Sequence, residues 1–166
     1  MNPTQLSLEL RHGQSPDLTR RRWILGLSAL GTVIGNVVAL YQTGIVRRLP
    51  DPPIPKVDSN KVNASDYAYK RLDTPDALLM VGTYAVTAAL AGAGGKNRAD
   101  TNPALPIAMG LKTIADTATN LKLAREEWQT NKARGFYCQT ATVLSAVTVA
   151  LAFPEMLRAF RKVLNR

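Results

Sequence analysis

Few side chains in this sequence have chemical reactivity, and the most distinctive of them is a lone cysteine. The chain contains one cysteine, Cys138, and one histidine, His12. A single cysteine excludes an intrachain disulfide, a Cys-x-x-Cys redox pair and a multi-cysteine metal site, and no other pattern predicts a bound metal. Two interpretations of Cys138 stay open. It is either a small buried apolar side chain or a reactive thiol, which makes it a weak catalytic candidate.

A second chemical feature is a pair of opposite charges inside an otherwise apolar segment. Lys112 and Asp116 are four residues apart, so on a helix they share one face and can neutralise each other. At membrane depth such a pair normally faces the interior of a helix bundle or a water-filled cavity. The pair is therefore either a structural contact or a functional polar site within the membrane.

The uneven distribution of charge predicts the elements that must hold these residues. Three stretches of 24, 19 and 20 residues carry no charge at all, namely 23–46, 77–95 and 135–154. At 1.5 Å per residue each is long enough to cross a hydrocarbon core of about 30 Å. Soluble helices usually carry a charged stripe, which these stretches lack, although a buried soluble all-α core is the alternative. The small residues in them also favour close packing of membrane helices.

The predicted fold is all-α, a bundle of four transmembrane helices with a long extramembrane loop between the first and second. The membrane domain covers 23–155, between an N-terminal tail at 1–22 and a basic C-terminal tail at 156–166. Its four spans are expected at about 23–46, 75–95, 102–123 and 135–154, with the loop at 47–74.

This topology places both termini on one side of the membrane. The arginines at 20–22, directly before the first span, favour the cytoplasmic side for both termini of this multi-pass cell-membrane protein. The same basic cluster indicates contact with anionic lipid headgroups of the bilayer. Nucleic acid is not an expected partner, because no recognition fold accompanies the cluster.

The loop at 47–74 has two local signals. Four prolines between positions 50 and 55 forbid a helix there and favour an extended chain. Thr74, followed by Pro75 and Asp76, predicts a helix start with Thr74 as its N-cap. A loop of this length on a small bundle is typical of a lid or a docking surface.

Taken together, these features resemble bacterial proteins of the vitamin K epoxide reductase (VKOR) family. The resemblance covers roughly residues 20–155, and its motifs are Ser65-Asp66-Tyr67-Ala68, Pro75-Asp76-Ala77-Leu78-Leu79 with Tyr84, and the passage from Ala124 to Cys138. It implies a four-helix bundle around a quinone pocket in a bacterial inner membrane. It also implies a membrane-embedded dithiol that reduces quinone while it oxidises the thiols of a partner protein.

The chain departs from the family pattern at that dithiol. The fourth helix of the family opens with Cys-x-x-Cys, whereas the corresponding stretch here is Gly135-Phe136-Tyr137-Cys138. Thiol–disulfide exchange needs one sulfur to attack and a second to resolve, so this chain alone cannot perform the family's reaction. Enzymatic activity is therefore not the favoured prediction.

Three functions remain open after this departure. The favoured one is a non-catalytic accessory or structural subunit of a membrane redox complex, which requires a membrane-protein partner. The second is a protein that binds a quinone or another lipophilic cofactor and transfers electrons. The third is a thiol oxidoreductase that uses Cys138 together with a partner thiol.

Three residues in or beside the spans are candidates for a quinone pocket. The hydroxyl groups of Tyr84 and Tyr137 and the amide of Asn120 could hydrogen-bond a quinone carbonyl in an apolar site. The alternative for each is a hydrogen bond between helices or an aromatic anchor at the membrane interface.

Overall fold

The structure is a computed structural model that describes residues 2–165, and over these residues it is helical without a β-sheet. The helices in chain order are α1 (Pro3–His12), α2 (Pro16–Gln42), α3 (Ser59–Asn63), the 3₁₀ helix η1 (Asp66–Tyr69), α4 (Asp76–Gly92), α5 (Arg98–Thr101), α6 (Ala104–Asn131) and α7 (Phe136–Leu164). The all-α prediction is confirmed.

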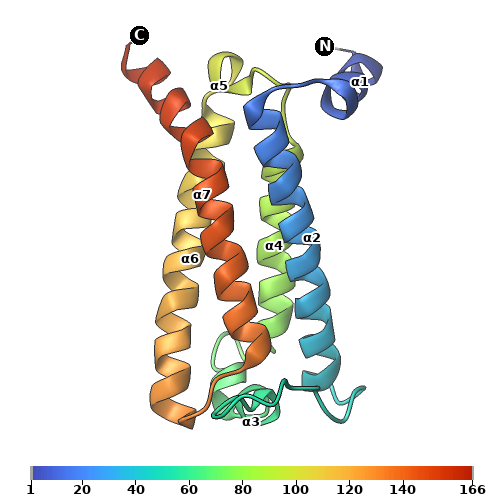
Figure 1. Cartoon of the computed structure of the whole chain (residues 1–166), viewed down its shortest axis with the longest axis vertical. Coiled ribbons are helices and arrows are strands. Elements are labelled where there is room, and N and C mark those ends of the chain that lie inside the picture. Colours follow the sequence, from blue (N-terminus) through green and yellow to red (C-terminus); the bar gives the residue numbers. More distant parts are fainter. Residues whose placement is uncertain (1, 166) are drawn as a thin grey trace.

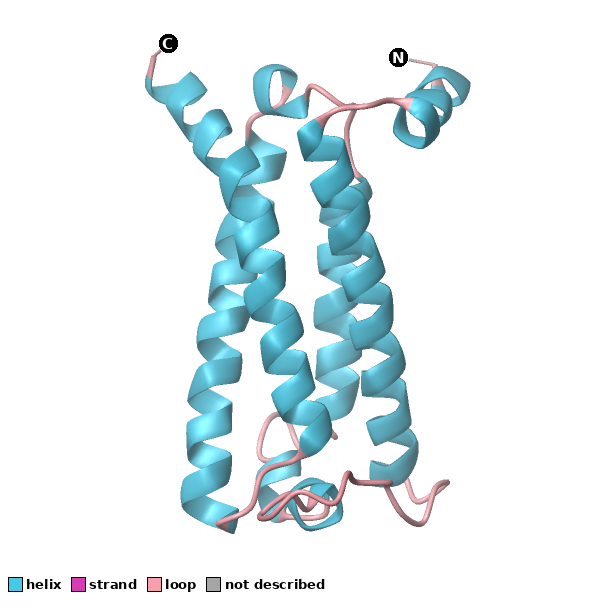
Figure 2. Cartoon of the chain, in the orientation of Figure 1, coloured by secondary structure: helices cyan, strands magenta, loops and turns pink. Residues whose placement is uncertain are grey.

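Four long helices form the body of the molecule. Helices α2, α4, α6 and α7 run up and down in turn, and α2 packs against α4 and α7 while α6 packs against α7 (Figure 1). Both termini lie at one end of the bundle, and the segment that contains α3 covers the other end (Figure 1). Irregular chain is confined to these two ends (Figure 2). By length and composition α2 and α7 could each cross a membrane, and α4 is a shorter apolar helix.

Small residues allow α2 and α4 to approach closely, as the composition of the spans predicts. A Cβ atom on Gly31 would lie 2.4 Å from the ring of Tyr84, and one on Gly35 would lie 2.8 Å from a methyl group of Val81. Side chains larger than hydrogen would therefore push the two helices apart. These two glycines fix the distance between α2 and α4.

Several helix boundaries differ from the sequence-based expectation: α2 begins earlier, at Pro16, and α6 ends later, at Asn131. The N-cap of α4 is Pro75, so the prediction of Thr74 is wrong: the Thr74 hydroxyl donates to the carbonyl of Leu72 instead. The side chain of Gln42, on α2, supplies the missing acceptor for the amide of Ala77 at 3.3 Å. A tertiary contact thus replaces the local cap.

Helix α7 continues beyond the predicted end of the fourth span. It passes through Pro154 and ends at Leu164, so most of the predicted tail at 156–166 is helical. Proline removes a backbone hydrogen bond and bends a helix, and the last part of α7 leans away from the bundle after this point (Figure 1). The residue after the proline, Glu155, is 2% exposed and lies in the interior of the bundle.

Glu155 takes part in a buried ion pair that joins α7 to α5. Arg98 has no exposed surface and donates two hydrogen bonds to the Glu155 carboxylate, at 2.8 and 2.9 Å. Arg98 also donates to the carbonyl of Ala93 at 2.8 Å, just beyond the end of α4. The paired charges and the free carbonyls therefore satisfy one another away from water.

A second buried arginine completes this end of the bundle. Arg21 is 1% exposed and donates to four backbone carbonyls at or just beyond the end of α4, those of residues 91, 93, 94 and 95, at 2.7–3.1 Å. The sequence analysis assigned this residue to the cluster that contacts lipid headgroups. That assignment is wrong for Arg21, because its guanidinium group acts as an internal cap for α4.

The buried pair generates a prediction about stability. Replacing Arg98 with Met should lower the free energy of unfolding by about 3–5 kcal/mol, because the Glu155 charge then stays buried without a partner. Unfolding in detergent, followed by circular dichroism, measures this loss. The matched control is Lys122→Ala, since Lys122 is largely exposed and lies 3.8 Å from Glu126. That change should cost less than about 1 kcal/mol. Equal stability of the two variants would contradict the role of the pair.

Candidate functional site

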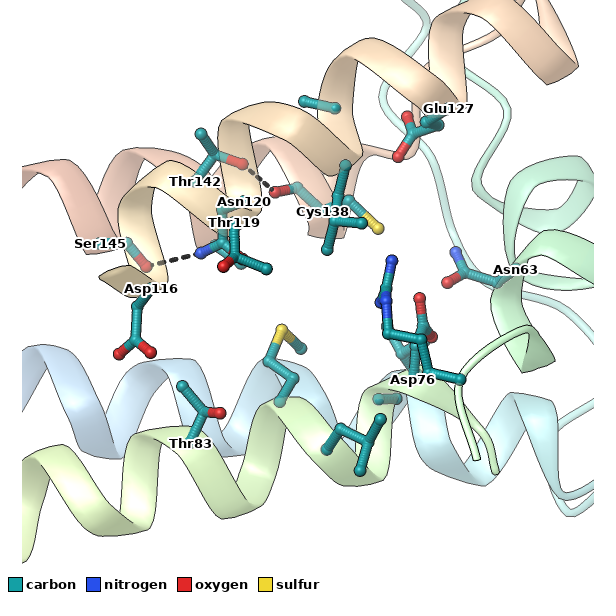
Figure 3. Close-up of a pocket in the computed structure, with 18 of the residues that line it drawn as sticks. Asn63, Asp76, Thr83, Asp116, Thr119, Asn120, Glu127, Cys138, Thr142 and Ser145 are labelled. Carbon is teal, nitrogen blue, oxygen red and sulfur yellow. Dashed lines mark hydrogen bonds between the residues drawn. The ribbon is translucent and has the colours of Figure 1, made fainter. Parts of the chain in front are cut away.

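A cavity of about 300 Å³ lies inside the bundle at the end that the loop covers. All four long helices contribute to its walls, and the loop contributes Val62, Asn63, Tyr67 and Arg71. Its walls combine apolar and polar side chains, with Asp116 and Ser145 toward one end and Asp76 and Glu127 toward the other (Figure 3). This volume is at the lower end of the range for small-molecule sites, and the mixture of wall types is typical of them.

Hydrogen bonds hold the loop over the end of the bundle. The hydroxyl of Ser59, at the start of α3, donates to Asp51 and accepts from the amide of Phe136 at 2.9 Å. Asn60 pairs with both backbone groups of Leu49, at 2.8 and 2.9 Å. The proline-rich part of the loop and the start of α7 are therefore both fastened to α3.

The loop is also joined to the turn between α6 and α7. Backbone bonds of 2.9 and 3.0 Å connect Arg134 to Lys56 and Asp58. Two cations lie over the ring of Trp128, with Lys56 at 5.5 Å and Arg134 at 5.2 Å from its centre. Trp128 thus binds loop and turn together.

Four of the polar side chains at the loop end of the cavity come from four different helices. Asn63, Asp76, Glu127 and Cys138 come from α3, α4, α6 and α7, and they face a common space (Figure 3). Glu127 is 2% exposed and accepts a hydrogen bond of 2.6 Å from the amide of Gly135. Asp76 accepts one of 2.8 Å from Gln42. Each side chain is thus held by a different element, and the cavity is the point where these elements meet.

Cys138 faces the cavity, where the cation that lines this end is Arg71 and not its sequence neighbour Arg134. The cysteine is a free thiol on the first turn of α7, near Glu127 (Figure 3). Arg134, four residues earlier, stacks on Trp128 instead. The described residues 2–165 include no group of three or more histidine, cysteine or acidic side chains that could hold a metal ion. The groups that this end offers to a ligand are hydrogen-bonding and titratable side chains together with one thiol.

The opposite end of the cavity contains the predicted intramembrane pair. Lys112 and Asp116 are 2.5 Å apart, and each side chain is 21% exposed. The ammonium group of Lys112 also donates to the carbonyl of Thr83 and the hydroxyl of Thr87, both on α4. The lysine thereby ties α6 to α4, and its partner Asp116 lines the cavity.

The three predicted pocket residues have different positions. Tyr84 and Asn120 line the cavity, where Tyr84 donates to the carbonyl of Ala141 at 3.1 Å and Asn120 donates to Ser145 at 2.8 Å. Tyr137 is not among the residues that line it. Its hydroxyl donates to the carbonyl of Pro50 at 2.9 Å, so it fastens the loop.

Sequence reasoning did not select Asn63, Asp76, Glu127 or Tyr67 for the site. A signal existed for Tyr67, which belongs to the Ser-x-Tyr-Ala element of the loop. Asp76 appeared only as part of a helix start and its motif, and Glu127 only within the passage from Ala124 to Cys138. Their convergence depends on how the loop covers the bundle, which no local pattern encodes.

Tyr67 connects the loop to α6 and has a perturbed ionisation. Its hydroxyl donates to the carbonyl of Leu123 at 3.2 Å and lies 3.4 Å from the carboxylate of Glu126. Burial, and then the negative charge of Glu126, raise the pKa of Tyr67 to about 12. Both effects disfavour the charged phenolate.

The raised pKa predicts that Tyr67 ionises at a higher pH than an exposed tyrosine does. An unfolded tyrosine ionises near pH 10, so the neutral Tyr67 contributes its stabilisation fully below pH 10 and loses it between about pH 10 and 12. Subtracting the phenolate absorbance of a Tyr67→Phe variant from that of the unaltered protein should give a curve centred near pH 12. A difference curve centred near pH 10 would contradict the buried position.

Comparison with known proteins agrees with this arrangement. The sequence model described as the vitamin K epoxide reductase family matches residues 22–153. No curated protein and no solved structure matches the chain. The family match covers all four long helices of the bundle in large part, together with the loop and the cavity. The chain therefore belongs to the vitamin K epoxide reductase family, and it is a membrane protein of the VKOR type.

Proposed function

We propose that α2, α4, α6 and α7 are four membrane spans of a single domain at 23–155. The family match, the long uncharged stretches and the glycine contacts between α2 and α4 support this topology. The charges on α6 are compatible with it, because Lys112 is paired with Asp116 and bonded to α4. Both termini are then on one side, the cytoplasmic side of a bacterial inner membrane, with the loop on the other.

We propose further that the cavity binds a quinone or a similar lipophilic ring. The observation that carries this proposal is the cavity itself, about 300 Å³ with both apolar and polar walls and with the loop covering one end. A small aromatic ring can contact the apolar walls, while its oxygen substituents reach the polar side chains. Membrane lipid supplies such molecules directly to a site among transmembrane helices.

The absence of a second sulfur limits what this chain does with the quinone. Cys138 is the one cysteine in the sequence, so no internal disulfide can accept or return electrons. We therefore propose a non-catalytic, quinone-binding subunit, and any dithiol in the reaction belongs to a membrane-protein partner. A mixed disulfide between Cys138 and a partner thiol is the second candidate, favoured only by the position of the sulfur at the cavity.

The lone thiol provides a direct test of ligand binding. Duroquinone, a fully methyl-substituted quinone, should protect Cys138 from N-ethylmaleimide, because both occupy the same space. Replacing Ala124, which lines the cavity, with Phe should weaken duroquinone binding about tenfold or more. The matched control is Leu121→Phe on the same helix, since Leu121 is 58% exposed and is not among the lining residues. Equal protection in both variants would place the ligand elsewhere.

A second test addresses the subunit role. Gentle detergent extraction from native membranes should yield the protein with a stoichiometric membrane partner, identified by mass spectrometry. A Cys138→Ser variant should retain this partner, because association is expected to rest on helix faces. Isolation of the protein without any partner would overturn the subunit proposal. Loss of the partner in the serine variant would favour the mixed disulfide instead.

A further inference from the structure

Two arginines from distant parts of the chain meet at one buried carboxylate, at the end of the bundle that carries the termini. Asp17 lies in the first turn of α2, and its side chain is 7% exposed. Arg20 of α2 lies 3.2 Å from one oxygen of Asp17, and Arg158 of α7 pairs with the other. The two arginine side chains are 36% and 54% exposed. One carboxylate neutralises only one of the two cations, so the cluster keeps a positive charge that a ligand can reach.

The other carboxylates at this end are held by other groups. Glu9 accepts from the backbone amide of Lys96 at 3.4 Å, and Asp100 lies 3.9 Å from Lys162. Glu155 is paired through both oxygens with Arg98. The excess charge of the cluster is therefore left for a partner that brings its own negative charge.

One face of α7 leads from this cluster along the apolar part of the helix. Val143, Val147, Pro154, Arg158 and Arg161 follow one another at intervals of three, four or seven residues, so they share a helix face. Val143 is 62% exposed and Val147 is 43% exposed. The face is thus apolar along most of its length and basic at its end. Its shape and charge suit an amphiphile with an anionic head and long apolar chains.

The length of α7 places the cluster at the depth of lipid phosphate groups. The helix has 29 residues and is therefore about 44 Å long, whereas the hydrocarbon core measures about 30 Å. Its last turns, which include Arg158, then extend into the headgroup layer. On α2, Trp23 follows Arg20 by one turn and is 64% exposed, and exposed tryptophan is typical of the membrane interface.

We propose that Arg20 and Arg158 bind the phosphate group of an anionic membrane phospholipid, whose acyl chains lie along the face of α7 from Val143 to Pro154. The guanidinium fork matches the oxygens of a phosphate, and basic pockets between membrane helices bind anionic headgroups. The sequence alone assigned lipid contact to residues 20–22, whereas the structure withdraws Arg21 and adds Arg158 from the other end of the chain. This inference rests on the proposed topology and concerns a surface separate from the cavity.

The test compares two lipids that share their acyl chains and their phosphate. Dioleoyl phosphatidylglycerol carries a net negative charge, whereas the choline group of dioleoyl phosphatidylcholine cancels that charge and is repelled by the arginines. Native mass spectrometry of the complete protein in detergent should show phosphatidylglycerol binding about fivefold more tightly, as expected for one uncompensated charge. Equal binding of the two lipids would overturn the inference.

Two further outcomes would also overturn it. If millimolar inorganic phosphate displaces the phosphatidylglycerol, the site takes a free anion and not a lipid. If the protein forms a dimer that excludes lipid, a second copy occupies the face. The topology is tested separately by insertion into phosphatidylcholine nanodiscs. A protein that stays outside them would contradict the proposed spans, whereas one that inserts without a lipid preference would contradict only the lipid site.

Three variants locate the site. Arg158→Gln should bring the binding ratio of the two lipids close to one, because Asp17 then neutralises Arg20. Arg158→Lys keeps the charge and should preserve most of the fivefold ratio. The matched control is Arg125→Gln, since Arg125 is an exposed arginine near the loop end of α6, and it should leave the ratio unchanged. An equal loss in the Arg125 and Arg158 variants would overturn the assignment. The comparison of lipids in the unaltered protein tests the proposal even if an Arg158 variant does not fold.

Discussion

The buried pair of Arg98 and Glu155 is the constraint on which the end of the bundle that carries both termini depends. Removing two charges from water costs several kcal/mol per ion, and only complete pairing offsets that cost. Arg98 meets the requirement with Glu155 and with carbonyl groups at the end of α4, and Arg21 covers the remaining carbonyls. The ends of α2, α4, α5 and α7 are therefore fixed relative to one another, since a shift of any of them would leave a charge or a carbonyl unmatched.

The cavity lies near the loop end of the bundle, and it is compatible with a stable fold because hydrogen bonds fix the elements at both ends of the cavity. Unfilled volume lowers stability, and helices normally move inward to reduce it. Here the loop is bonded to α7 through Ser59, and Lys112 connects α6 to α4. These contacts fix the elements around the cavity relative to one another, so polar bonds as well as apolar packing position its walls. The side chains around it come from four helices and one loop, which makes the site a product of the whole fold.

The sequence predicts the parts of this structure that depend on local pattern. Uncharged stretches identify the helices, and the spacing of Lys112 and Asp116 predicts their contact. Long-range features are invisible at that level: Arg98 and Glu155 are 57 residues apart, and each looks like an ordinary charge at the end of a span. The direction of Tyr137 was not predictable either, because it depends on where the proline-rich chain passes. Asn63 lies in a five-residue helix whose position is set by contacts with Asp51, Leu49 and Arg134.

The separation of the buried pair along the chain has a consequence for biosynthesis. Arg98 leaves the ribosome well before Glu155, so the turn between α4 and α6 carries an arginine that has no counter-charge until the last helix is made. The carbonyl groups that Arg21 and Arg98 bind are available earlier and can hold both side chains meanwhile. Helix α7 therefore completes the bundle when its Glu155 neutralises the charge of Arg98. A chain that stops before Glu155 would leave Arg98 without a counter-charge and expose it to cellular quality control.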